Sequence, residues 1–212
     1  MEIKTKQQLK FCILADRMMN QGAFKFTLKQ RLKKVLFPSY GDLILDYLSA
    51  MRKCSYYRHS PSMLGGGKLS YIINLRRFKK LGIRLVFTLG YDSFGYGLRI
   101  PHYGTIVIGA KTQVGNYTCI HTSTCITNTG KVIGDGLYLA TGAKITTHLS
   151  LANGVQIGAN SVVNKTFSEG NIMIAGAPAV KKKDAIPWYL SDAHKWKFEK
   201  IEELSKKMKV DL

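Results

Sequence analysis

An aliphatic residue recurs at every sixth position through the middle of the chain, and this spacing constrains the fold more than any other feature. The repeat runs from Ile108 to Val163, with one inserted residue between Ile126 and Ile133. An amphipathic helix needs a hydrophobic period of 3.6 residues and a half-buried strand a period of 2, so a period of 6 fits neither element alone. The ten positions are Ile108, Val114, Ile120, Ile126, Ile133, Leu139, Ile145, Leu151, Ile157 and Val163.

A solenoid does fit this period. If each hexad forms one short strand and a turn, three hexads close a triangular coil, and the aliphatic residues of successive coils stack into a continuous core. Small or turn-prone residues follow the aliphatic positions, as sharp turns require. Three places further comes a small or modest residue, such as Thr112, Gly130 or Ala143. We therefore expect a β-solenoid.

Two flanking motifs give the repeat a family resemblance. Residues 97–109 read Gly-Leu-Arg-Ile-Pro-His-Tyr-Gly-Thr-Ile-Val-Ile-Gly, and residues 175–179 read Ala-Gly-Ala-Pro-Ala. Together with the hexads, these motifs resemble the hexapeptide-repeat acyltransferases, and most closely the branch of serine acetyltransferase and its relatives that acetylate sugars. The resemblance implies a mainly β fold, a left-handed parallel β-helix with an N-terminal α-helical region and a C-terminal α-helix.

The chain is expected to divide into three regions. Residues 1–84 form a helical region that caps the open end of the solenoid, residues 85–183 form the β-helix, and residues 184–212 form an amphipathic helix. The tryptophans and lysines of the last region suit packing on a subunit, and they also suit a helix lying on a membrane surface.

Apolar periodicity predicts three stretches of helix in the first region. They cover residues 3–35, 42–58 and 68–80, the last with Gly82 as its C-cap. The expected breaks are Gly22, Pro38 with Gly41, Ser60 to Ser62, and the triplet Gly65-Gly66-Gly67.

The charge of the chain favours an anionic partner. Its 32 Lys and Arg exceed its 13 Asp and Glu by 19, and most of the excess lies in the flanks. No helix-turn-helix, zinc-finger or RNA-binding signature accompanies the charge, so nucleic acid is not expected. Coenzyme A phosphates, an acidic glycan, a lipid diphosphate and the inner membrane surface all fit, as does a solvated basic surface without a partner.

The cysteine pattern and the N-terminal sequence indicate where in the cell the protein is located and whether it binds a metal. Cys12, Cys54, Cys119 and Cys125 form no CxxC pair, so buried free thiols are expected rather than metal ligands. The N-terminus lacks the plan of a secretion signal, and no run of 18 apolar residues occurs. We expect a cytoplasmic protein that binds no metal.

His102 is the residue to which the resemblance assigns the chemistry. Acetyl transfer from a thioester to a hydroxyl needs a base, a donor for the oxyanion and a cradle for coenzyme A. A histidine suits the base because its ordinary pKa of about 6.5 leaves it neutral near pH 7. His102, within Ile-Pro-His-Tyr-Gly, matches the histidine that is the general base in serine acetyltransferases. The alternative is a hydrogen-bonded histidine at a corner of the coil.

The partner that would orient His102 is not evident. In the family an aspartate fifteen residues earlier fills this role, and that position here is Phe87. Asp92 is the nearest carboxylate in sequence, although it could simply be a turn residue. A backbone carbonyl could instead fix the tautomer of the ring.

Other polar residues could hold the acceptor. His121 follows His102 by nineteen residues, close to one coil, so it could bind the acceptor, stabilise the oxyanion or face solvent. Tyr103 and Asn128 are suitable aromatic and amide groups, as are Tyr91 and Tyr96. His148 could point toward the coenzyme channel.

The acceptor is expected to be a sugar hydroxyl. The family's aspartate that contacts the serine amine is Pro101 here, and the loop carrying an Arg-His pair is shortened to residues 128–132. Without these groups a free amino acid would be poorly held.

The resemblance also implies a coenzyme site in the groove between subunits of a homotrimer. Small side chains and free amides would line the pantetheine arm, and lysines would meet the phosphates. The implied residues are Thr141, Gly142, Ala159, Ala177, Pro178, Lys181, Lys182 and Lys183.

We therefore expect an acetyl-CoA-dependent O-acetyltransferase that acts on a sugar or polysaccharide precursor, with His102 as its base. The alternatives are a serine O-acetyltransferase of cysteine biosynthesis and a non-catalytic hexapeptide-repeat scaffold. Contact with a membrane or a lipid-linked glycan through the basic flanks is a further expectation.

Overall fold

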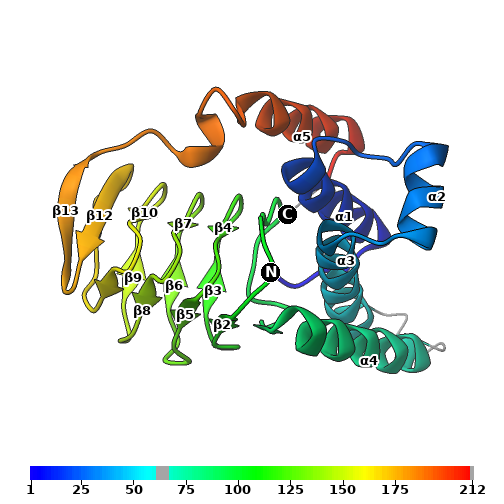
Figure 1. The fold of residues 1–212 in the computed structure, drawn as a ribbon, viewed down its shortest axis with the longest axis horizontal. Coiled ribbons are helices and arrows are strands. Elements are labelled where there is room, and N and C mark those ends of the chain that lie inside the picture. The colour runs from blue at the N-terminus through cyan, green and yellow to red at the C-terminus, as the bar shows by residue number, and fades with distance from the viewer. Residues whose placement is uncertain (61–66, 211–212) are drawn as a thin grey trace.

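The structure is a computed structural model that describes residues 1–60 and 67–210. It is a β-solenoid with helices packed at one end, and the segment after the last strand returns along its side to a final helix at that same end (Figure 1). The expected loop from Pro61 to Gly66 lies outside the described residues. The predicted fold class is confirmed.

Three sheets form the walls of the solenoid. Sheet 1 contains β1 (Phe87–Thr88), β2 (Ile106–Ile108), β5 (Thr124–Ile126), β8 (Lys144–Ile145) and β11 (Val162–Val163). Sheet 2 contains β4 (Cys119–Ile120), β7 (Tyr138–Leu139), β10 (Gln156–Ile157), β12 (Ile172–Gly176) and β13 (Ala179–Asp184). Sheet 3 contains β3 (Gln113–Val114), β6 (Val132–Ile133) and β9 (Ser150–Leu151). All strand pairs are parallel except β12 with β13.

The ten aliphatic positions of the repeat fill the core as predicted. Each has an exposed fraction between 0 and 5%. They stack in register from coil to coil, as in the column that joins Ile108, Ile126, Ile145 and Val163. Because burying each such side chain stabilises a fold by roughly 1.5–3 kcal/mol, these columns form the main core of the solenoid.

The inserted residue changes one inward position. Thr112 is buried as the repeat predicts, but Lys131, not Gly130, takes this position in the longer hexad. Its Nζ donates to the carbonyl oxygen of Thr127 at 2.6 Å and to the hydroxyls of Thr127 and Thr129 at 2.8 and 2.5 Å. The buried ammonium group of Lys131 thus holds the loop of residues 127–131 through these hydrogen bonds.

The helical region contains α1 (Lys6–Gln21), α2 (Leu28–Leu36), α3 (Tyr40–His59) and α4 (Gly67–Leu85). Thr5, Thr27 and Ser39 begin the first three of these with capping boxes, and Gly22, at φ 72°, ends α1 as predicted. Gly41 does not break the chain, because the cap at Ser39 places it in the first turn of α3.

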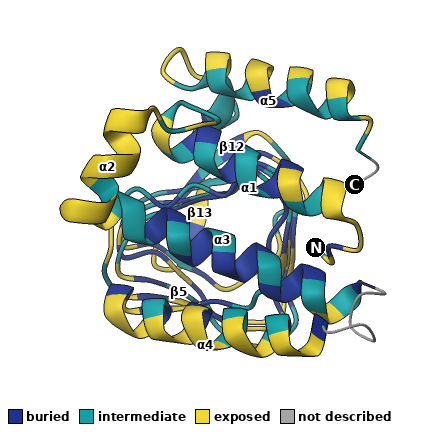
Figure 2. Ribbon diagram, turned by 90° about the vertical axis from the view of Figure 1, so that its right-hand side faces the viewer, coloured by how far each residue is buried: buried dark blue, intermediate teal, exposed yellow. Residues whose placement is uncertain are grey.

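Helices α3 and α4 close the first end of the solenoid. The ring of Tyr47 stacks on Phe78 with centroids 4.6 Å apart and meets Phe87 of β1 edge-on at 5.3 Å. Figure 2 shows the buried face of α3 between α1 and α4. The helices therefore cover the open coil, which would otherwise expose unpaired strand groups.

Gly82 does not end α4, which continues to Leu85. A Cβ at this buried position would lie 2.9 Å from the carbonyl oxygen of Phe87 and 3.3 Å from Tyr47 Cε2. The glycine is needed because the helix and the first strand approach closely here, not because of a C-cap.

The C-terminal helix packs on its own chain. A 3-10 turn, η2 (Trp188–Leu190), precedes α5 (Lys195–Met208), which lies beside α1 in Figure 1. Trp188 is buried and donates from Nε1 to the carbonyl oxygen of Tyr117 at 2.8 Å, while Ile201 of α5 has no exposed surface. In residues 1–60 and 67–210, no helix is both long and apolar enough to cross a membrane.

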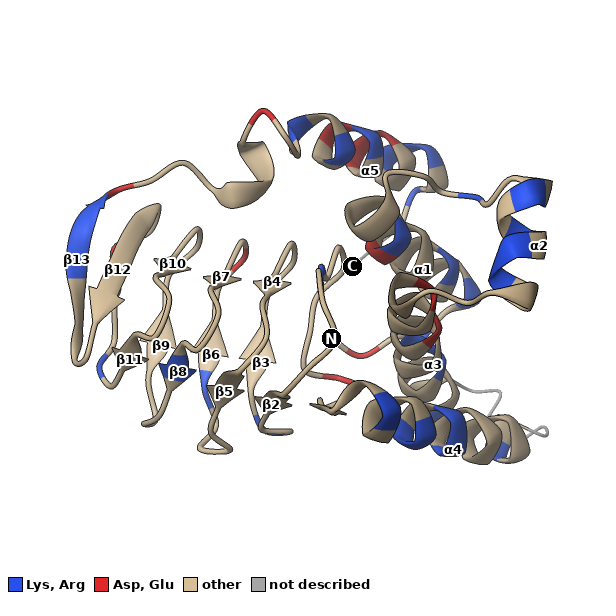
Figure 3. Cartoon of the chain, viewed as in Figure 1, with Lys and Arg blue, Asp and Glu red and all other residues tan. Residues whose placement is uncertain are grey.

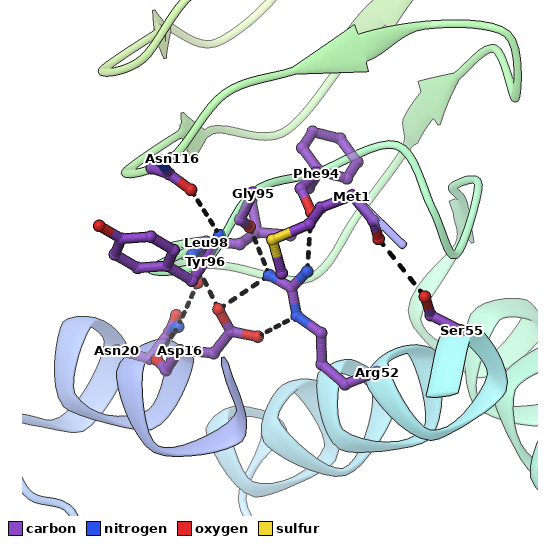
Figure 4. A network of polar contacts seen from close by, with 10 residues as sticks. All are labelled: Met1, Asp16, Asn20, Arg52, Ser55, Phe94, Gly95, Tyr96, Leu98 and Asn116. Atoms are coloured by element: carbon purple, nitrogen blue, oxygen red, sulfur yellow. Dashed lines mark hydrogen bonds and ion pairs between the residues drawn. The ribbon is translucent and has the colours of Figure 1, made fainter. Parts of the chain in front are cut away.

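A buried polar network joins the helices to the first coil (Figure 4). Arg52 of α3 donates to both carboxylate oxygens of Asp16 and to the carbonyl oxygens of Phe94 and Gly95. The carboxylate of Asp16 also accepts from the backbone N–H of Leu98 at 2.9 Å. These bonds fix the strand segment that leads to residue 102.

Candidate active site

One edge of the prism collects most of the predicted site residues. It lies between sheets 2 and 1, where each coil turns from one sheet to the other, and we call it the histidine edge. It comprises residues 101–105, 121–123, 140–143 and 158–161, and it continues to residues 175–178, where the chain turns back from β12 to β13 within sheet 2. The predicted residues on it are His102, Tyr103, His121, Thr141, Gly142, Ala159, Ala177 and Pro178.

Hydrogen bonds hold the turns of this edge in register. The N–H of Gly142 donates to the carbonyl oxygen of Thr122 at 3.1 Å, and the N–H of Asn160 donates to that of Thr141 at 2.9 Å. Gly142 has φ 77°, a conformation that favours glycine. The exposed side chain of Thr141 is therefore followed by Gly142, which has no side chain to cover the backbone there.

His102 and His121 lie on adjacent coils, as their spacing predicts. Burial lowers the pKa of His121, and the positive charges of Arg99 and of protonated His102 lower it further, so the two rings are electrostatic neighbours. His121 Nε2 lies 3.8 Å from Cys119 Sγ, and its ring centroid lies 5.1 Å from that of Tyr138. His121 is thus favoured in its neutral form.

A hollow of about 370 Å³ opens beside His102, between the solenoid and the helices. The end of α1 and the beginning of α3 form one wall, and the chain from residue 99 to 102 forms the other. Its lining is Asn20, Gln21, Ser39, Tyr40, Gly41, Ile44, Arg99, Ile100, Pro101 and His102. This volume suits a small molecule.

Arg99 is a lining residue that the sequence analysis did not single out, although it belongs to the quoted motif. Its Nη1 lies 3.6 Å from Cys119 Sγ, and its guanidinium carbon lies 6.0 Å from the ring centroid of Trp188. Its Nε is buried without a hydrogen-bond partner in the part of the chain that the structure describes. Arg99 precedes His102 by three residues in sequence, but only the pairing of its coil with the next brings it near His121.

Three of the weighed residues lie on a different edge, between sheets 1 and 3. Asp92 Oδ2 bonds to His59 Nε2 at 2.8 Å, so this carboxylate faces the helical region and does not orient His102. Asn128 accepts from the N–H of Lys111 at 2.8 Å. His148 Nδ1 lies 2.9 Å from the carbonyl oxygen of Thr129, in the shortened loop. Within one chain, none of the three shares the histidine edge.

The tyrosines divide in the same way. Tyr103 is 58% exposed, and its ring centroid lies 5.7 Å from that of Tyr40 at the rim of the hollow. Tyr91 instead meets the hydroxyl of Tyr71 at 3.3 Å, and Tyr96 donates to Glu202 of α5 at 3.2 Å. Of the tyrosines that the sequence suggested, only Tyr103 therefore adjoins His102.

The predicted phosphate-binding lysines lie on β13. Lys181 is paired with Glu169 at 2.5 Å and with Asp184 at 2.7 Å, so its charge is partly neutralised within the chain. Lys182 and Lys183 are exposed on the same strand, next to the turn at Ala177 and Pro178. Figure 3 shows this basic strand at the end of the solenoid.

The four cysteines are free thiols, three buried and Cys125 partly exposed. Burial raises the pKa of Cys119 to about 11, which keeps its thiol protonated at neutral pH. No group of three or more potential metal ligands occurs among the residues described here.

Comparison with known proteins supports the family resemblance. The serine acetyltransferase of Buchnera aphidicola subsp. Acyrthosiphon pisum (strain APS) is 27% identical over 180 residues, which is 79% of this chain and 65% of that protein. The match spans about two thirds of the length of the Buchnera aphidicola protein. This chain is similar to the serine acetyltransferases. No protein-family model matches the sequence.

Solved serine acetyltransferases share the fold. The Neisseria gonorrhoeae serine acetyltransferase in complex with serine has a TM-score of 0.56 at 20% identity, and covers 84% of this chain and 70% of that one. The enzyme from Brucella abortus strain S19 in complex with coenzyme A has a TM-score of 0.55 at 20% identity, and covers 85% and 68%. The serine acetyltransferase-like fold therefore includes the helices as well as the coils.

Proposed function

We propose that the protein is an acetyl-CoA-dependent O-acetyltransferase of the serine acetyltransferase type. The observation that carries this proposal is the histidine edge, on which His102 and the residues implied in coenzyme binding form one line along the solenoid. The similarity to serine acetyltransferases supports the same chemistry.

His102 acts as the general base in this proposal. The hydroxyl oxygen of the acceptor attacks the thioester carbonyl carbon while the imidazole accepts the hydroxyl proton. The tetrahedral intermediate then collapses, the carbon–sulfur bond breaks, and the proton passes to the departing thiolate. The products are an acetyl ester and free coenzyme A. The exposed position of His102 at the mouth of the hollow lets both substrates reach it.

His121 and Arg99 stabilise the charge that develops on the carbonyl oxygen. A neutral imidazole can donate one hydrogen bond to an oxyanion, and the lowered pKa of His121 favours this form. Arg99 adds a fixed positive charge that acts on His121, and it lines the same hollow as His102.

Serine is the first acceptor to test, because the relatives are serine acetyltransferases and one was solved with serine. Arg99, which lines the hollow, could pair with the carboxylate of an amino acid.

A sugar hydroxyl is the second candidate. The described lining of the hollow contains no Asp or Glu, so it offers no carboxylate to pair with the ammonium of serine. A sugar carries no such charge, and the hydroxyl of Tyr40 could bind one of its hydroxyls, whereas the polar groups of Asn20 and Ser39 already form hydrogen bonds within the chain.

The coenzyme would lie along the histidine edge, with pantetheine beside Thr141, Gly142 and Ala159 and the phosphates near Lys182. We propose a homotrimer, since Tyr103 and Val107 follow His102 on the same coil with exposed side chains that a neighbouring subunit could cover. The cytoplasm, which supplies acetyl-CoA, is the location we propose.

A thiol-release assay tests the proposal. Acetyl-CoA is supplied with L-serine and, separately, with a panel of neutral and acidic sugars, and the release of free coenzyme A is compared with that of the His102→Ala variant. Turnover of serine with a sub-millimolar KM supports serine as the acceptor, and turnover of a sugar alone supports the second candidate. If calorimetry detects no binding of acetyl-CoA, the non-catalytic scaffold is the better interpretation.

A further inference from the structure

Helix α2 is an apolar and basic helix that projects from the molecule. The structure buries none of its residues. Figures 1 and 2 show it at the far end of the helical region, exposed over nearly its whole length. Its large apolar side chains and their exposed fractions are Leu28 84%, Leu32 61%, Val35 78% and Leu36 60%, followed by Phe37 at 74%.

These apolar residues share one face. Their spacing of four, seven and eight residues from Leu28 places them within a single stripe of an α-helix. Because each residue of an α-helix is rotated by about 100° from the one before it, Lys29 borders one side of this stripe and Arg31 borders the other. Basic side chains that border an apolar stripe are typical of helices that lie in a membrane interface, where long stems reach up to the phosphates.

The segment from Lys25 to Phe37 carries five basic residues and no acidic one. Figure 3 shows the same concentration of blue on α2. Among residues 1–60 and 67–210, the ion pair that holds one of these five is that of Lys34 with Asp46 of α3, at 2.6 Å. That ion pair attaches the segment to the rest of the protein, as does Arg17 of α1, whose guanidinium carbon lies 4.9 Å from the ring centroid of Phe26. The apolar stripe meanwhile faces solvent.

We propose that α2 docks the protein on an anionic phospholipid surface. The stripe would enter the interface, and Lys29, Arg31 and Lys33 would contact lipid phosphates. A second copy of the chain suits this face less well, because pairing two such segments would bring ten like charges together. The helix projects from the molecule as a convex surface, so it is better suited to insert into a membrane surface than to bind a peptide.

The expected membrane contact of the C-terminal helix is thereby moved to another element. Ile201 of α5 is fully buried against the body, whereas α2 has no such partner among the described residues. The proposal does not depend on the acetyl-transfer activity, since none of the α2 residues lines the hollow at His102.

Vesicle cosedimentation tests the proposal with the full chain. Vesicles of pure phosphatidylcholine are compared with vesicles that contain roughly 30% phosphatidylglycerol, at low and high salt. We expect binding to the anionic vesicles alone, and weaker binding at high salt. Equal binding to both vesicles, or no binding to either, would overturn the proposal.

Two matched pairs of variants locate the contact. Leu28→Ser/Leu32→Ser/Leu36→Ser is paired with Leu69→Ser/Ile72→Ser/Ile73→Ser, which removes exposed apolar groups from basic helix α4. Lys29→Gln/Arg31→Gln/Lys33→Gln is paired with Lys195→Gln/Lys206→Gln/Lys207→Gln on α5, an equal change of charge. Each α2 variant should weaken binding about tenfold to 100-fold and its partner less than twofold. Equal losses within a pair would show that α2 is not the site.

Two further measurements separate lipid binding from folding and self-association. Tryptophan emission of the Phe37→Trp variant is compared with that of wild type, and anionic vesicles should add a blue-shifted component. Its absence would contradict insertion. Sedimentation velocity without vesicles should give the wild-type mass for the α2 variants. A lower mass would instead make this face a contact between copies, and would overturn the proposal.

Discussion

The carboxylate of Asp16 receives two hydrogen bonds from the guanidinium of Arg52, at 2.8 and 3.0 Å, in a site closed to solvent. Burial alone would lower the pKa of Arg52, but the carboxylate of Asp16 more than offsets this and raises it. The pair links α1 and α3, and both of its residues also bond the first coil.

Removing one member of this pair should destabilise the fold strongly. Asp16→Ala leaves a buried guanidinium without its counter-ion, which typically costs about 3–5 kcal/mol. The double variant Asp16→Leu/Arg52→Met should recover much of that loss, because it leaves no buried charge. Urea unfolding of the three proteins measures both effects. A double variant no more stable than Asp16→Ala would show that the bonds to the first coil, and not the charge pair, dominate.

His102→Ala should lower kcat by roughly 10²–10⁴, which is the usual contribution of a positioned base. The side chain is exposed, so the melting temperature should stay within a few degrees of wild type. His148→Ala is the matched control, since it removes an exposed histidine from the other edge. Equal losses of kcat in the two variants, measured by thiol release, would contradict the assignment.

The lowered pKa of His121 predicts a pH dependence of stability. Below its ordinary value of 6.5, the unfolded chain takes up a proton that the folded chain does not, so stability should fall as the pH drops through this window. His121→Gln should make that decline shallower. Urea midpoints on either side of pH 6.5 test this, and identical slopes for the two proteins would argue against a half-buried neutral imidazole.

Gly82→Ala should destabilise the fold by about 1–3 kcal/mol, although alanine is the better helix former. The added methyl would crowd the carbonyl oxygen of Phe87. Gly41→Ala is the control, because its nearest neighbour, Ser39 Oγ, lies 3.7 Å from the new Cβ. Thermal melts compare them, and a more stable Gly82→Ala variant would mean that the α4 contact with β1 is loose.

The exposed lysines of β13 should affect the coenzyme and not the acceptor. Lys182→Ala/Lys183→Ala should raise the KM for acetyl-CoA roughly tenfold with little change in kcat, since it removes ground-state contacts to phosphate. The KM for the acceptor serves as the internal control. An unchanged KM for acetyl-CoA would leave these lysines as solvated charges.

The solenoid could be predicted from sequence because its signal is local and repeated. Ile126 and Ile145 pair because every coil has nearly the same length, so a count along the chain gives the register. The same count placed His102 and His121 on neighbouring coils, and the structure agrees.

The remaining contacts join segments that are distant in sequence, and the six-residue repeat carries no information about them. Asp92 is ten residues from His102 in sequence, yet its partner is His59 of α3. The docking of α1 and α3 against residues 99–102 creates the hollow, in which Asn20 bonds to the backbone of Leu98 and Ile100. Such contacts between distant segments require the packing of whole helices, which the sequence alone did not show.

Strand β13 turns back against β12, so the final pair of the solenoid runs in opposite directions. Helices α3 and α4 cover the first coil, and at the other end sheet 2 finishes on this reversed strand. Open parallel ends invite a further strand from another molecule. A helical cover at one end and a reversed, lysine-rich edge strand at the other hinder coil-on-coil growth into fibres, and favour association through the flat sides.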